Sequence, residues 1–399
     1  MAMLILDSPS NDPAFNIAAE EYLLKEKEEE YAFFYINNPS VIVGKHQNAL
    51  AEINLPWTRQ HDIPVIRRMS GGGTVWHDRG NLNFSFIRNG EQGKLVNFRE
   101  YAAPILAGLR GMGIDAEFGE RNEILAGGYK ISGNAEHIHR NRVLHHGTLL
   151  YASDLGMLRN ALDMDPGLYE DRAVQSIRSR VGNILDLLEK PLEMADFRRQ
   201  IIAGVMMESP GSEISVLSDA DTGRILDMVR EKYRTWEWNM GYSPRYRLRH
   251  EWMIGRVLLE TGIEVEKGLI RSCRLSVLKQ FLTPGGTPPG EESKTMLPDD
   301  SLVPGAKNYG DMDDILGEIP PGPLPDDRSS RTRSGPAPQR HEAAAAARDA
   351  RRLEGLASAL TGLRHDPAVL RRAISDRALV KPGWIDTFVR GLFPQSRES

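Results

Sequence analysis

The sequence predicts an α+β protein of two domains, and its length, composition and apolar spacing support this prediction. The 399 residues exceed the length at which a single hydrophobic core usually stops growing. Hydrophobic residues make up 40% of the chain and charged residues 26%, as in soluble globular proteins. Strand-like runs alternate with segments in which apolar residues recur at helical spacing, so both kinds of element are expected.

The first helix is expected after a short strand, MLILDS, at residues 3–8. Asp12 can cap this helix, and Pro13 suits its first position. Helical spacing places four apolar side chains on one face, those of Phe15, Ala19, Tyr22 and Leu23. The segment is therefore predicted to form an amphipathic helix.

Strands are expected next, because the following apolar runs are bounded by turn residues. They are YAFFYI (31–36), SVIVGKHQN (40–48), IPVIRRM (63–69) and NLNFSFIR (81–88). We expect the last run to continue the same sheet, with Leu82, Phe84 and Phe86 on one side. Apolar spacing predicts a helix at 99–112, despite Pro104. Two strands joined by the turn HRNR are expected within 129–151, and three further helices near 155–164, 194–207 and 219–235.

The composition changes in the second half of the chain. Residues 284–338 hold 11 of the 24 prolines, which is typical of a long loop or a disordered segment. Strand-like residues precede this segment at 263–277, and strongly helical residues follow it at 341–374. We predict a larger domain at residues 1–245 and a small accessory domain made of residues 246–282 and 340–399. A Pro/Gly-rich insertion at residues 283–339 is expected to separate the two pieces of the small domain.

Charge and cysteine content narrow the classes of function. The net charge of −5 argues against nucleic acid as the main partner. Cys273 is the only cysteine, so no internal disulfide can form, and no Cys/His array is present to hold a metal. The sequence contains no run of about 18 apolar residues that would predict a membrane span, and its N-terminus does not resemble a signal peptide. A cytoplasmic protein without a membrane partner is expected.

The stretch RRMSGGGTVW, residues 67–76, is the first candidate for a binding site. It is neither a Walker loop nor a GxGxxG turn that opens a helix. Glycine amides can nevertheless form a concave anion site, and Arg67 or Arg68 can supply permanently charged donors to a phosphate. A plain hairpin turn with surface arginines is the equally open alternative.

Lys130 is the second candidate, because it lies between a Gly-Gly turn and the small residues SGNA. A lysine at the start of a strand is usually solvated. Here the small neighbours leave room for a ligand, and Asn122 and Glu123 offer polar groups nearby in sequence. These residues could therefore belong to a polar site.

Histidines and arginines give weaker signals. His145 and His146 are adjacent on an expected strand and point to opposite faces, so at most one reaches a shared site. The HIH segment at 137–139 could bind metal, but a structural role is commoner. Arg178 and Arg180 share a face if extended, and could present charge to an anionic partner or simply to solvent. The sequence contains no nucleophile elbow or metalloprotease helix, which disfavours hydrolytic chemistry.

Taken together and in order, these segments resemble the lipoate-protein ligase family. The resemblance covers NDPAFNIAAEEYLL, YINNPSVIVGKHQNALAEIN, RRMSGGGTVWHDRGNLNFSF, RNEILAGGYKISGNAEH, HHGTLLY and SIRSRVGNI, most of residues 6–185. It implies a fold shared with biotin ligases, a mixed β-sheet flanked by helices with a class II synthetase-like core, and a smaller α+β C-terminal domain. The larger domain would then be catalytic.

The resemblance also implies an activity. Such enzymes activate lipoate with ATP and Mg²⁺ to lipoyl-AMP, and transfer the lipoyl group to a lysine of an acceptor protein. The implied acceptors are apo lipoyl domains of 2-oxoacid dehydrogenases and the glycine-cleavage H protein. These acceptors are typically acidic, so Arg178 and Arg180 could steer them.

Residue roles follow from the same resemblance. Lys130 would be the catalytic cation and would contact lipoate together with Arg68. ATP and lipoyl-AMP would be bound by Arg68, Ser70, Gly71, Gly72, Gly73, Thr74, Val75, Trp76, Asn81, Asn122, Glu123 and Lys130. Glu123 replaces the family's Asp, and Mg²⁺ is expected near it, without a protein cluster of metal ligands. The apolar tail of lipoate would lie in a tunnel that strand residues line, such as Phe33, Phe34 and Val43.

Other functions on the same fold remain as alternatives. An octanoyl- or lipoyl-transferase needs a thiol in the catalytic domain, whereas Cys273 falls in the predicted small domain. A biotin ligase would carry an arginine-rich glycine loop, which is absent. A catalytically inactive lipoyl-binding protein is the third alternative, and the presence of both Lys130 and the Arg68 loop argues against it.

Overall fold

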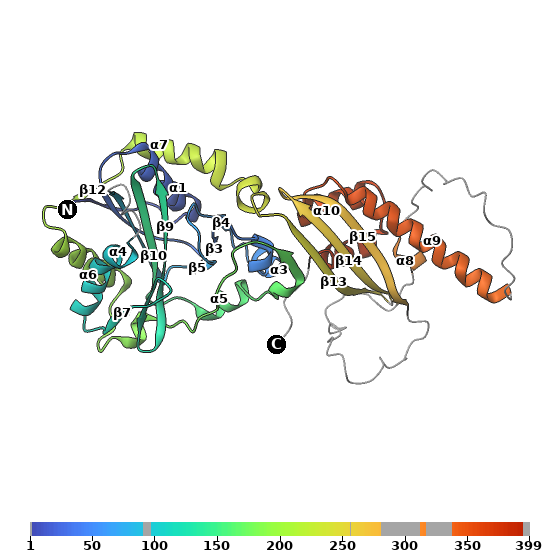
Figure 1. Ribbon diagram of the computed structural model, residues 1–399, viewed down its shortest axis with the longest axis horizontal. Coiled ribbons are helices and arrows are strands. Elements are labelled where there is room, and N and C mark those ends of the chain that lie inside the picture. The colour runs from blue at the N-terminus through green and yellow to red at the C-terminus, as the bar shows by residue number, and fades with distance from the viewer. Residues whose placement is uncertain (1, 91–96, 256, 281–311, 317–336, 394–399) are drawn as a thin grey trace. The chain divides into compact units, whose positions relative to one another are not determined.

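The described part of the chain forms two compact units in the computed structural model (Figure 1). The model describes residues 2–90, 97–255, 257–280, 312–316 and 337–393. Unit 1 comprises residues 1–163 and 173–243, and unit 2 comprises residues 164–172 and 244–399. The insertion predicted at 283–339 lies outside the described residues apart from 312–316 and 337–339. No helix within the described ranges has both the length and the apolar character needed to cross a membrane.

Unit 1 contains most of the strands. They are β1 (Leu4–Asp7), β2 (Tyr31–Ile36), β3 (Ser40–Val43), β4 (Val65–Arg67), β5 (Val75–His77), β6 (Asn81–Asn89), β7 (Ala116–Phe118), β8 (Glu123–Ala126), β9 (Tyr129–His139), β10 (Arg142–Leu150) and β12 (Glu213–Ser215). Its α-helices are α1 (Pro13–Glu26), α2 (Ala49–Glu52), α3 (Leu55–Gln60), α4 (Phe98–Gly111), α5 (Leu155–Ala161), α6 (Met194–Glu208) and α7 (Asp219–Met228). Shorter turns of helix are η2 (Ile184–Leu187), η3 (Val229–Tyr233) and η4 (Glu237–Gly241).

The strands of unit 1 form two sheets. The 8-stranded sheet has the order β12-β1-β2-β6-β10-β9-β8-β7, with β1 parallel to both neighbours and the other pairs antiparallel. A 3-stranded sheet has the order β4-β3-β5. The prediction that 81–88 continues one sheet with 40–48 and 63–69 was therefore wrong. β6 instead pairs with β2, which places Phe84 opposite Phe34.

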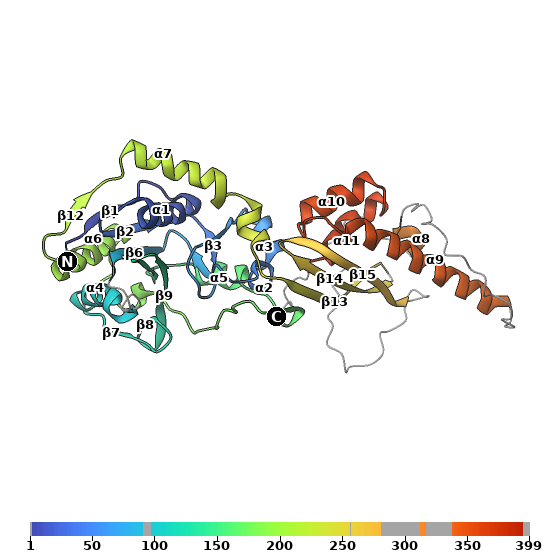
Figure 2. The same ribbon diagram turned by 45° about the horizontal axis from the view of Figure 1, so that its top comes forward.

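Each face of the large sheet is covered by its own helices and core (Figure 2). Along each strand, alternate side chains belong to different cores, because successive side chains of a strand point to opposite faces. Leu82, Phe84 and Phe86 share one core with α4 and α6, which confirms the predicted alternation. Phe33 and Ile87 point to the other core, with α1 and α7.

Helix α1 begins as predicted but is not amphipathic. Asp12 accepts a hydrogen bond from the Ala14 amide, and Pro13 takes the first helical position. Every residue from Pro13 to Leu24 is buried, because α1 contacts the sheet on one side and α7 with η3 on the other. The expectation of a solvent-facing polar stripe was wrong, and the acidic residues Glu20 and Glu21 are instead buried.

Unit 2 is a second α+β unit. Its 4-stranded sheet has the order β11-β13-β14-β15, formed by β11 (Tyr169–Asp171), β13 (Tyr246–Ile254), β14 (Val257–Glu266) and β15 (Leu269–Gln280). The helical elements are η1 (Pro166–Leu168), α8 (Met312–Ile315), α9 (Ala337–Leu360), α10 (Pro367–Asp376), η6 (Pro382–Trp384) and α11 (Ile385–Gly391). The run predicted at 263–277 is divided by a turn at Lys267 and Gly268, both with positive φ.

Candidate active site

A cavity of about 280 Å³ lies in unit 1, among the strands and loops that the sequence motifs form. One part of its wall is apolar and contains Ile17, Tyr35, Ile42 and Val75. Another part is polar and contains Arg68, the glycine loop, Lys130 and the segment 174–179. A cavity lined by both apolar and positively charged side chains suits a ligand with an acyl chain and an anionic end.

The glycine loop, residues 70–74, is held in shape by Arg68. The Arg68 guanidinium donates to the carbonyls of Gly71 and Gly73 at 2.5 and 2.8 Å, and its Nε donates to Ser70 Oγ at 2.9 Å. Gly72 has a φ of +82°, which favours glycine. Burial lowers the pKa of Arg68 to about 10, so the side chain stays charged at neutral pH.

Close backbone approach explains two other glycines. A Cβ at Gly44 would lie 2.1 Å from the Gly72 carbonyl oxygen, so only glycine lets these loops meet. A Cβ at Gly73 would lie 2.9 Å from Ser176 Oγ, and the Thr74 amide donates to that same hydroxyl at 2.8 Å. The glycine loop is thus packed against the segment 174–179 along the cavity wall.

Arg67 has a different position from Arg68. Its guanidinium is fully buried away from the cavity and donates to the backbone carbonyls of Gly44, Gln47 and Asn239 at 2.8–2.9 Å. A further bond reaches Ser243 Oγ at 3.0 Å. Arg67 therefore ties β4 to the 238–243 segment, whereas Arg68 belongs to the site.

Lys130 lies near the start of β9, with its backbone bonded to a neighbouring segment. Its amide donates to the Arg180 carbonyl at 3.0 Å, and the Gly182 amide donates to the Lys130 carbonyl at 3.3 Å. Burial lowers the pKa of Lys130, the Arg68 charge lowers it further, and Glu123 opposes this shift. A negatively charged ligand would therefore stabilise the charged form of Lys130.

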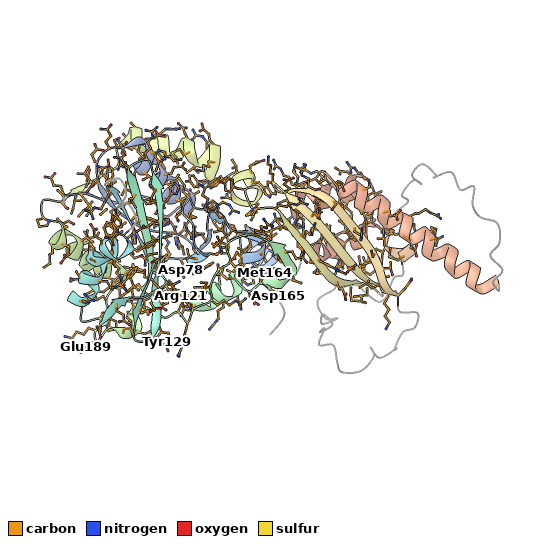
Figure 3. The ribbon with its side chains drawn as sticks, in the orientation of Figure 1. Asp78, Arg121, Tyr129, Met164, Asp165 and Glu189 are labelled. Carbon is orange, nitrogen blue, oxygen red and sulfur yellow. The ribbon has the colours of Figure 1, made fainter. Side chains whose placement is uncertain are left out.

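Acceptor groups without partners lie near Lys130. Among the described residues, Glu123 Oε2 and Asn134 Oδ1 are buried without a hydrogen-bond partner, and both residues line the cavity. Asn122 has a φ of +60°, and its carbonyl accepts from Asn134 Nδ2 at 2.9 Å. Arg121, labelled in Figure 3, adds a positive charge to the same part of the wall. These acceptors could meet a cation or the donor groups of a ligand.

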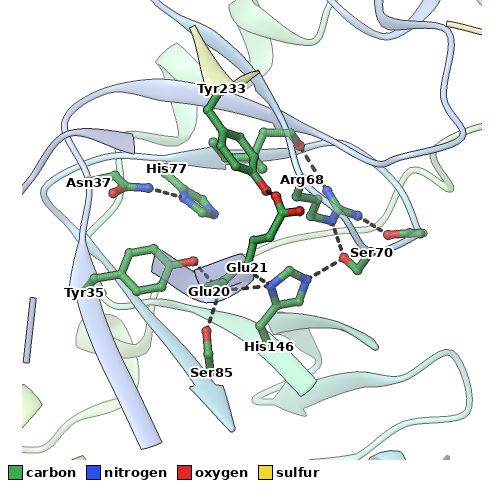
Figure 4. A network of polar contacts seen from close by, with 12 residues as sticks. Glu20, Glu21, Tyr35, Asn37, Arg68, Ser70, His77, Ser85, His146 and Tyr233 are labelled. Carbon is green, nitrogen blue, oxygen red and sulfur yellow. Dashed lines mark hydrogen bonds and ion pairs between the residues drawn. The ribbon is translucent and has the colours of Figure 1, made fainter. Parts of the chain in front are cut away.

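A buried chain of hydrogen bonds connects Arg68 to helix α1 (Figure 4). Ser70 Oγ, which accepts from Arg68, lies 2.6 Å from His146 Nε2. His146 Nδ1 lies 2.9 Å from Glu20 Oε2, and the hydroxyls of Tyr35 and Ser85 also donate to the Glu20 carboxylate. The glycine loop and α1 are thus parts of one polar network.

The predicted site residues divide into two groups. Those that line the cavity are Arg68, Gly72, Gly73, Thr74, Val75, Asn122, Glu123 and Lys130. The others do not line the cavity: Ser70 and Gly71 accept hydrogen bonds from Arg68, Trp76 donates to Asp78, and Asn81 donates to the cavity residue Asn83. Their roles in ligand binding stay predictions.

The residues expected to line an acyl tunnel do not line the cavity. Phe33 and Phe34 pack in the two cores, and Val43 is also buried away from the cavity. Tyr35 and Ile42 line the cavity instead, and their strand neighbours Phe34 and Val43 face the opposite way. Phe33 shares the face of Tyr35 but packs in the core beside α1.

Several residues of the site were missed or left undecided by the sequence. Glu20, Tyr35, His77 and Ser176 were not singled out, although an adjacent glutamate pair inside an apolar helix was a signal for Glu20. Of the adjacent histidines, His146 faces the cavity, and His145 is buried beside Glu136. No group of His, Cys, Asp and Glu residues in the described ranges could hold a metal ion, those of the HIH segment included.

Comparisons with known proteins connect this site to one family. The model of the lipoyl protein ligase A/B catalytic domain matches residues 12–206. Lipoate-protein ligase 1 of Staphylococcus aureus is 41% identical over 266 residues, which cover 66% of this chain and 81% of that protein. Lipoate-protein ligase LplJ of Bacillus subtilis is 37% identical over 278 residues, which cover 68% and 84%.

Solved structures agree with these sequence relatives. A putative lipoate protein ligase of Thermoplasma acidophilum with bound lipoic acid is 27% identical, with a TM-score of 0.51 over 60% of this chain and 100% of that chain. A structure of the archaeal bipartite ligase and its E2 lipoyl domain matches with 27% identity, a TM-score of 0.53 and coverage of 61% and 97%. Lipoate-protein ligase A bound with ATP matches with 27% identity, a TM-score of 0.52 and coverage of 61% and 100%. The predicted α+β ligase fold is confirmed, and the chain belongs to the lipoate-protein ligase family.

Proposed function

We propose that this chain is an ATP-dependent, AMP-forming lipoate-protein ligase. The observation that carries the proposal is one cavity lined by Lys130, by Arg68 and by apolar side chains, in a chain of this family. The apolar wall suits the acyl chain of lipoate, and the cations suit a carboxylate and a phosphate together. Relatives bound to lipoic acid and to ATP support the same pair of substrates.

In the first step, a lipoate carboxylate oxygen forms a bond to the α-phosphorus of ATP. The bond between that phosphorus and the bridging oxygen breaks, and pyrophosphate leaves with the electron pair. Both reactants are anions, so preorganised cations offset their repulsion and the charge that develops during transfer. Lys130, which lines the cavity, would supply this charge, and Arg68 holds the glycine loop that lines the same cavity.

The nucleotide is expected along the polar wall. The unpaired oxygen of Glu123 fits a hard cation, so Glu123 would contact the Mg²⁺ that accompanies ATP. That ion would neutralise phosphate charge as pyrophosphate forms. In the conformation described here the Thr74 amide is already bonded to Ser176, so phosphate would compete with that hydroxyl.

In the second step, the ε-amine of an acceptor lysine attacks the lipoyl carbonyl and AMP leaves. Candidate acceptors are lipoyl domains of 2-oxoacid dehydrogenases and the glycine-cleavage H protein. Arg180 stacks over the ring of Tyr129, with its carbon Cζ 4.5 Å from the centroid, and donates to the hydroxyl at 2.8 Å. This held cation, near the backbone of Lys130, would attract an acidic acceptor.

The thiol of Cys273 does not favour a transferase that works through a thioester. This residue lies on β15 of unit 2, and burial raises its pKa to about 12, which disfavours the thiolate. Because it is the only cysteine, no thiol exists at the cavity of unit 1. A single reduced cysteine also agrees with the proposed cytoplasmic location.

Assaying the two steps separately tests the proposal. The full chain is incubated with ATP, Mg²⁺, lipoate and an apo lipoyl domain, and lipoyl-AMP and lipoylated acceptor are both followed. Lys130→Ala should lower adenylate formation at least 100-fold, because it removes the cation at the reacting centre. Lys279→Ala on unit 2 serves as the matched control and should remain active.

Each result of this assay decides between functions. Folded wild-type protein that forms neither product would contradict the ligase and favour an inactive lipoyl-binding protein. Acceptor modification without ATP would instead indicate an acyl transferase. Near-wild-type activity of Lys130→Ala would show that the catalytic cation lies elsewhere.

A further inference from the structure

His77 presents a buried hydrogen-bond donor to the cavity. It lies at the end of β5, lines the cavity and is only 3% exposed. Its Nδ1 is 2.9 Å from Asn37 Nδ2, while its Nε2 is buried and has no partner among the described residues. Buried polar groups are normally paired, so an unpaired one at a cavity wall points to a ligand group.

The neighbouring amides determine which nitrogen of His77 carries the proton. Asn16 Nδ2 donates to the Ser10 carbonyl at 3.0 Å, which fixes that end of Asn16 as the amide nitrogen, since a carbonyl only accepts. The same Nδ2 donates to Asn37 Oδ1 at 2.8 Å. Asn37 must therefore present its own Nδ2 to His77. The facing Nδ1 accepts, and the proton of the neutral ring is on Nε2.

The ring is neutral under ordinary conditions. Burial lowers the pKa of His77 to about 3, and the positive charge of Arg68 lowers it in the same direction. Figure 4 shows the ring between Asn37 on one side and Arg68 with His146 on the other. The cavity thus receives one N–H donor from His77 without a positive charge.

The donor belongs to the acyl part of the cavity. Lys130 lies on β9 and Glu123 on β8, whereas His77 lies on β5. His77 lies two residues after Val75 on β5, so both side chains point to the same face of the strand, and Val75 pairs with Ile42 of β3, which also lines the cavity. A carboxylate held at Lys130 would therefore direct its tail toward His77.

We propose that His77 is a specificity-determining residue whose Nε2–H donates to a sulfur of the lipoate dithiolane ring. The proposal rests on the proposed ligase function. A purely aliphatic acid such as octanoate offers no acceptor and leaves this donor unpaired, which penalises its binding. Disulfide sulfur is a weak acceptor, so the preference for lipoate should be on the order of tenfold.

The test compares lipoate with two acids that lack sulfur, one of which keeps a five-membered ring. The substrates are lipoate, octanoate and 5-cyclopentylpentanoate, which replaces the dithiolane by a carbocycle of equal ring size. For each acid, kcat/KM of adenylate formation is measured with the full chain by pyrophosphate release. The variants are His77→Phe, which keeps a ring and removes the donor, and Ile42→Val, which changes the apolar wall alone.

The proposal predicts the ratios of kcat/KM between the acids. Wild-type protein should prefer lipoate to 5-cyclopentylpentanoate by on the order of tenfold. His77→Phe should bring this ratio close to one, while Ile42→Val should leave it within about twofold of wild type. Asn37→Asp provides a second route if His77→Phe does not fold. Its carboxylate accepts from Nδ1, which moves the proton away from Nε2, and the ratio should fall again.

Two outcomes would overturn the proposal. Equal kcat/KM for lipoate and its carbocyclic analogue in wild-type protein would show that the sulfurs are not recognised. If His77→Phe lowers kcat/KM equally for all the acids, the donor acts at the carboxylate end of the substrate or has a purely structural role. Failure of the proposed function is distinct, because folded wild-type protein would then form no adenylate with any acid.

Discussion

Arg67 and Arg68 are adjacent in the sequence but differ in what they stabilise. Arg68 shapes the glycine loop at the cavity, whereas Arg67 saturates its donors with backbone carbonyls of two distant segments. Arginine suits this position because its planar fork presents five donors and remains charged. Lysine could not satisfy the same carbonyls.

Replacing Arg67 should therefore destabilise unit 1. We expect Arg67→Ala to lower the free energy of unfolding by about 3 kcal/mol or more, since several buried carbonyls would lose their partner. Urea denaturation followed by tryptophan fluorescence would measure the change. Arg199→Ala is the matched control, because that exposed arginine should change stability by less than about 0.5 kcal/mol. Equal effects of the two substitutions would contradict the structural role of Arg67.

The sequence could place both arginines beside the glycines but could not assign their roles. Neighbouring residues point to opposite faces of a strand, and local sequence does not tell which face meets the ligand. The same ambiguity explains why Phe34 and Val43 were chosen where Tyr35 and Ile42 line the cavity. Lys130 could be located because its glycine neighbours and the family resemblance agreed.

At the scale of elements, helix α1 is coupled to the glycine loop by the chain from Glu20 to Arg68. Arg68 Nε–H donates to Ser70 Oγ, Ser70 Oγ is hydrogen-bonded to His146 Nε2, and His146 Nδ1–H donates to the Glu20 carboxylate. The chain begins at a cation and ends at a carboxylate. It therefore lets two buried charges balance each other without direct contact.

Glu20→Ala should weaken both the fold and the site. The substitution leaves the donors of Tyr35, Ser85 and His146 unpaired, so we expect a loss of about 3–5 kcal/mol of unfolding free energy. KM for ATP should also rise several-fold, because Ser70 and Arg68 lose a fixed neighbour. Glu26→Ala, on the exposed end of the same helix, should change neither stability nor KM appreciably. An unchanged KM for ATP in folded Glu20→Ala would contradict the coupling between α1 and the glycine loop.

Element positions were easier to predict than element environments. The caps and first residues of α1 and the β9–β10 hairpin depend on local sequence, and the structure confirms them. Burial of Glu20 and division of the strands between two sheets depend on contacts with α7 and β10, which are distant in sequence. Such contacts cannot be derived from the periodicity of one segment.

At the scale of the whole molecule, the described cavity is lined entirely by unit 1. Unit 2 has its own sheet, and its strand β11 comes from residues 169–171, between two segments of unit 1. No shift in composition marks that short segment, so it could not be separated from unit 1 by sequence alone. Each unit has its own buried apolar residues, as expected of parts that can unfold separately.

Ligand binding should therefore stabilise the two units unequally. We expect two transitions in differential scanning calorimetry of the full chain. A sulfamoyl analogue of lipoyl-AMP at about 100 times its Kd should stabilise one of them by about 2.7 kcal/mol, because the ligand binds folded unit 1 and not the unfolded chain. The other transition should not move. Lys130→Ala supplies the control, since weaker binding should reduce the shift at the same ligand concentration. A single transition, or two that rise together, would show that the units unfold cooperatively and that the energetics of the site extend beyond unit 1.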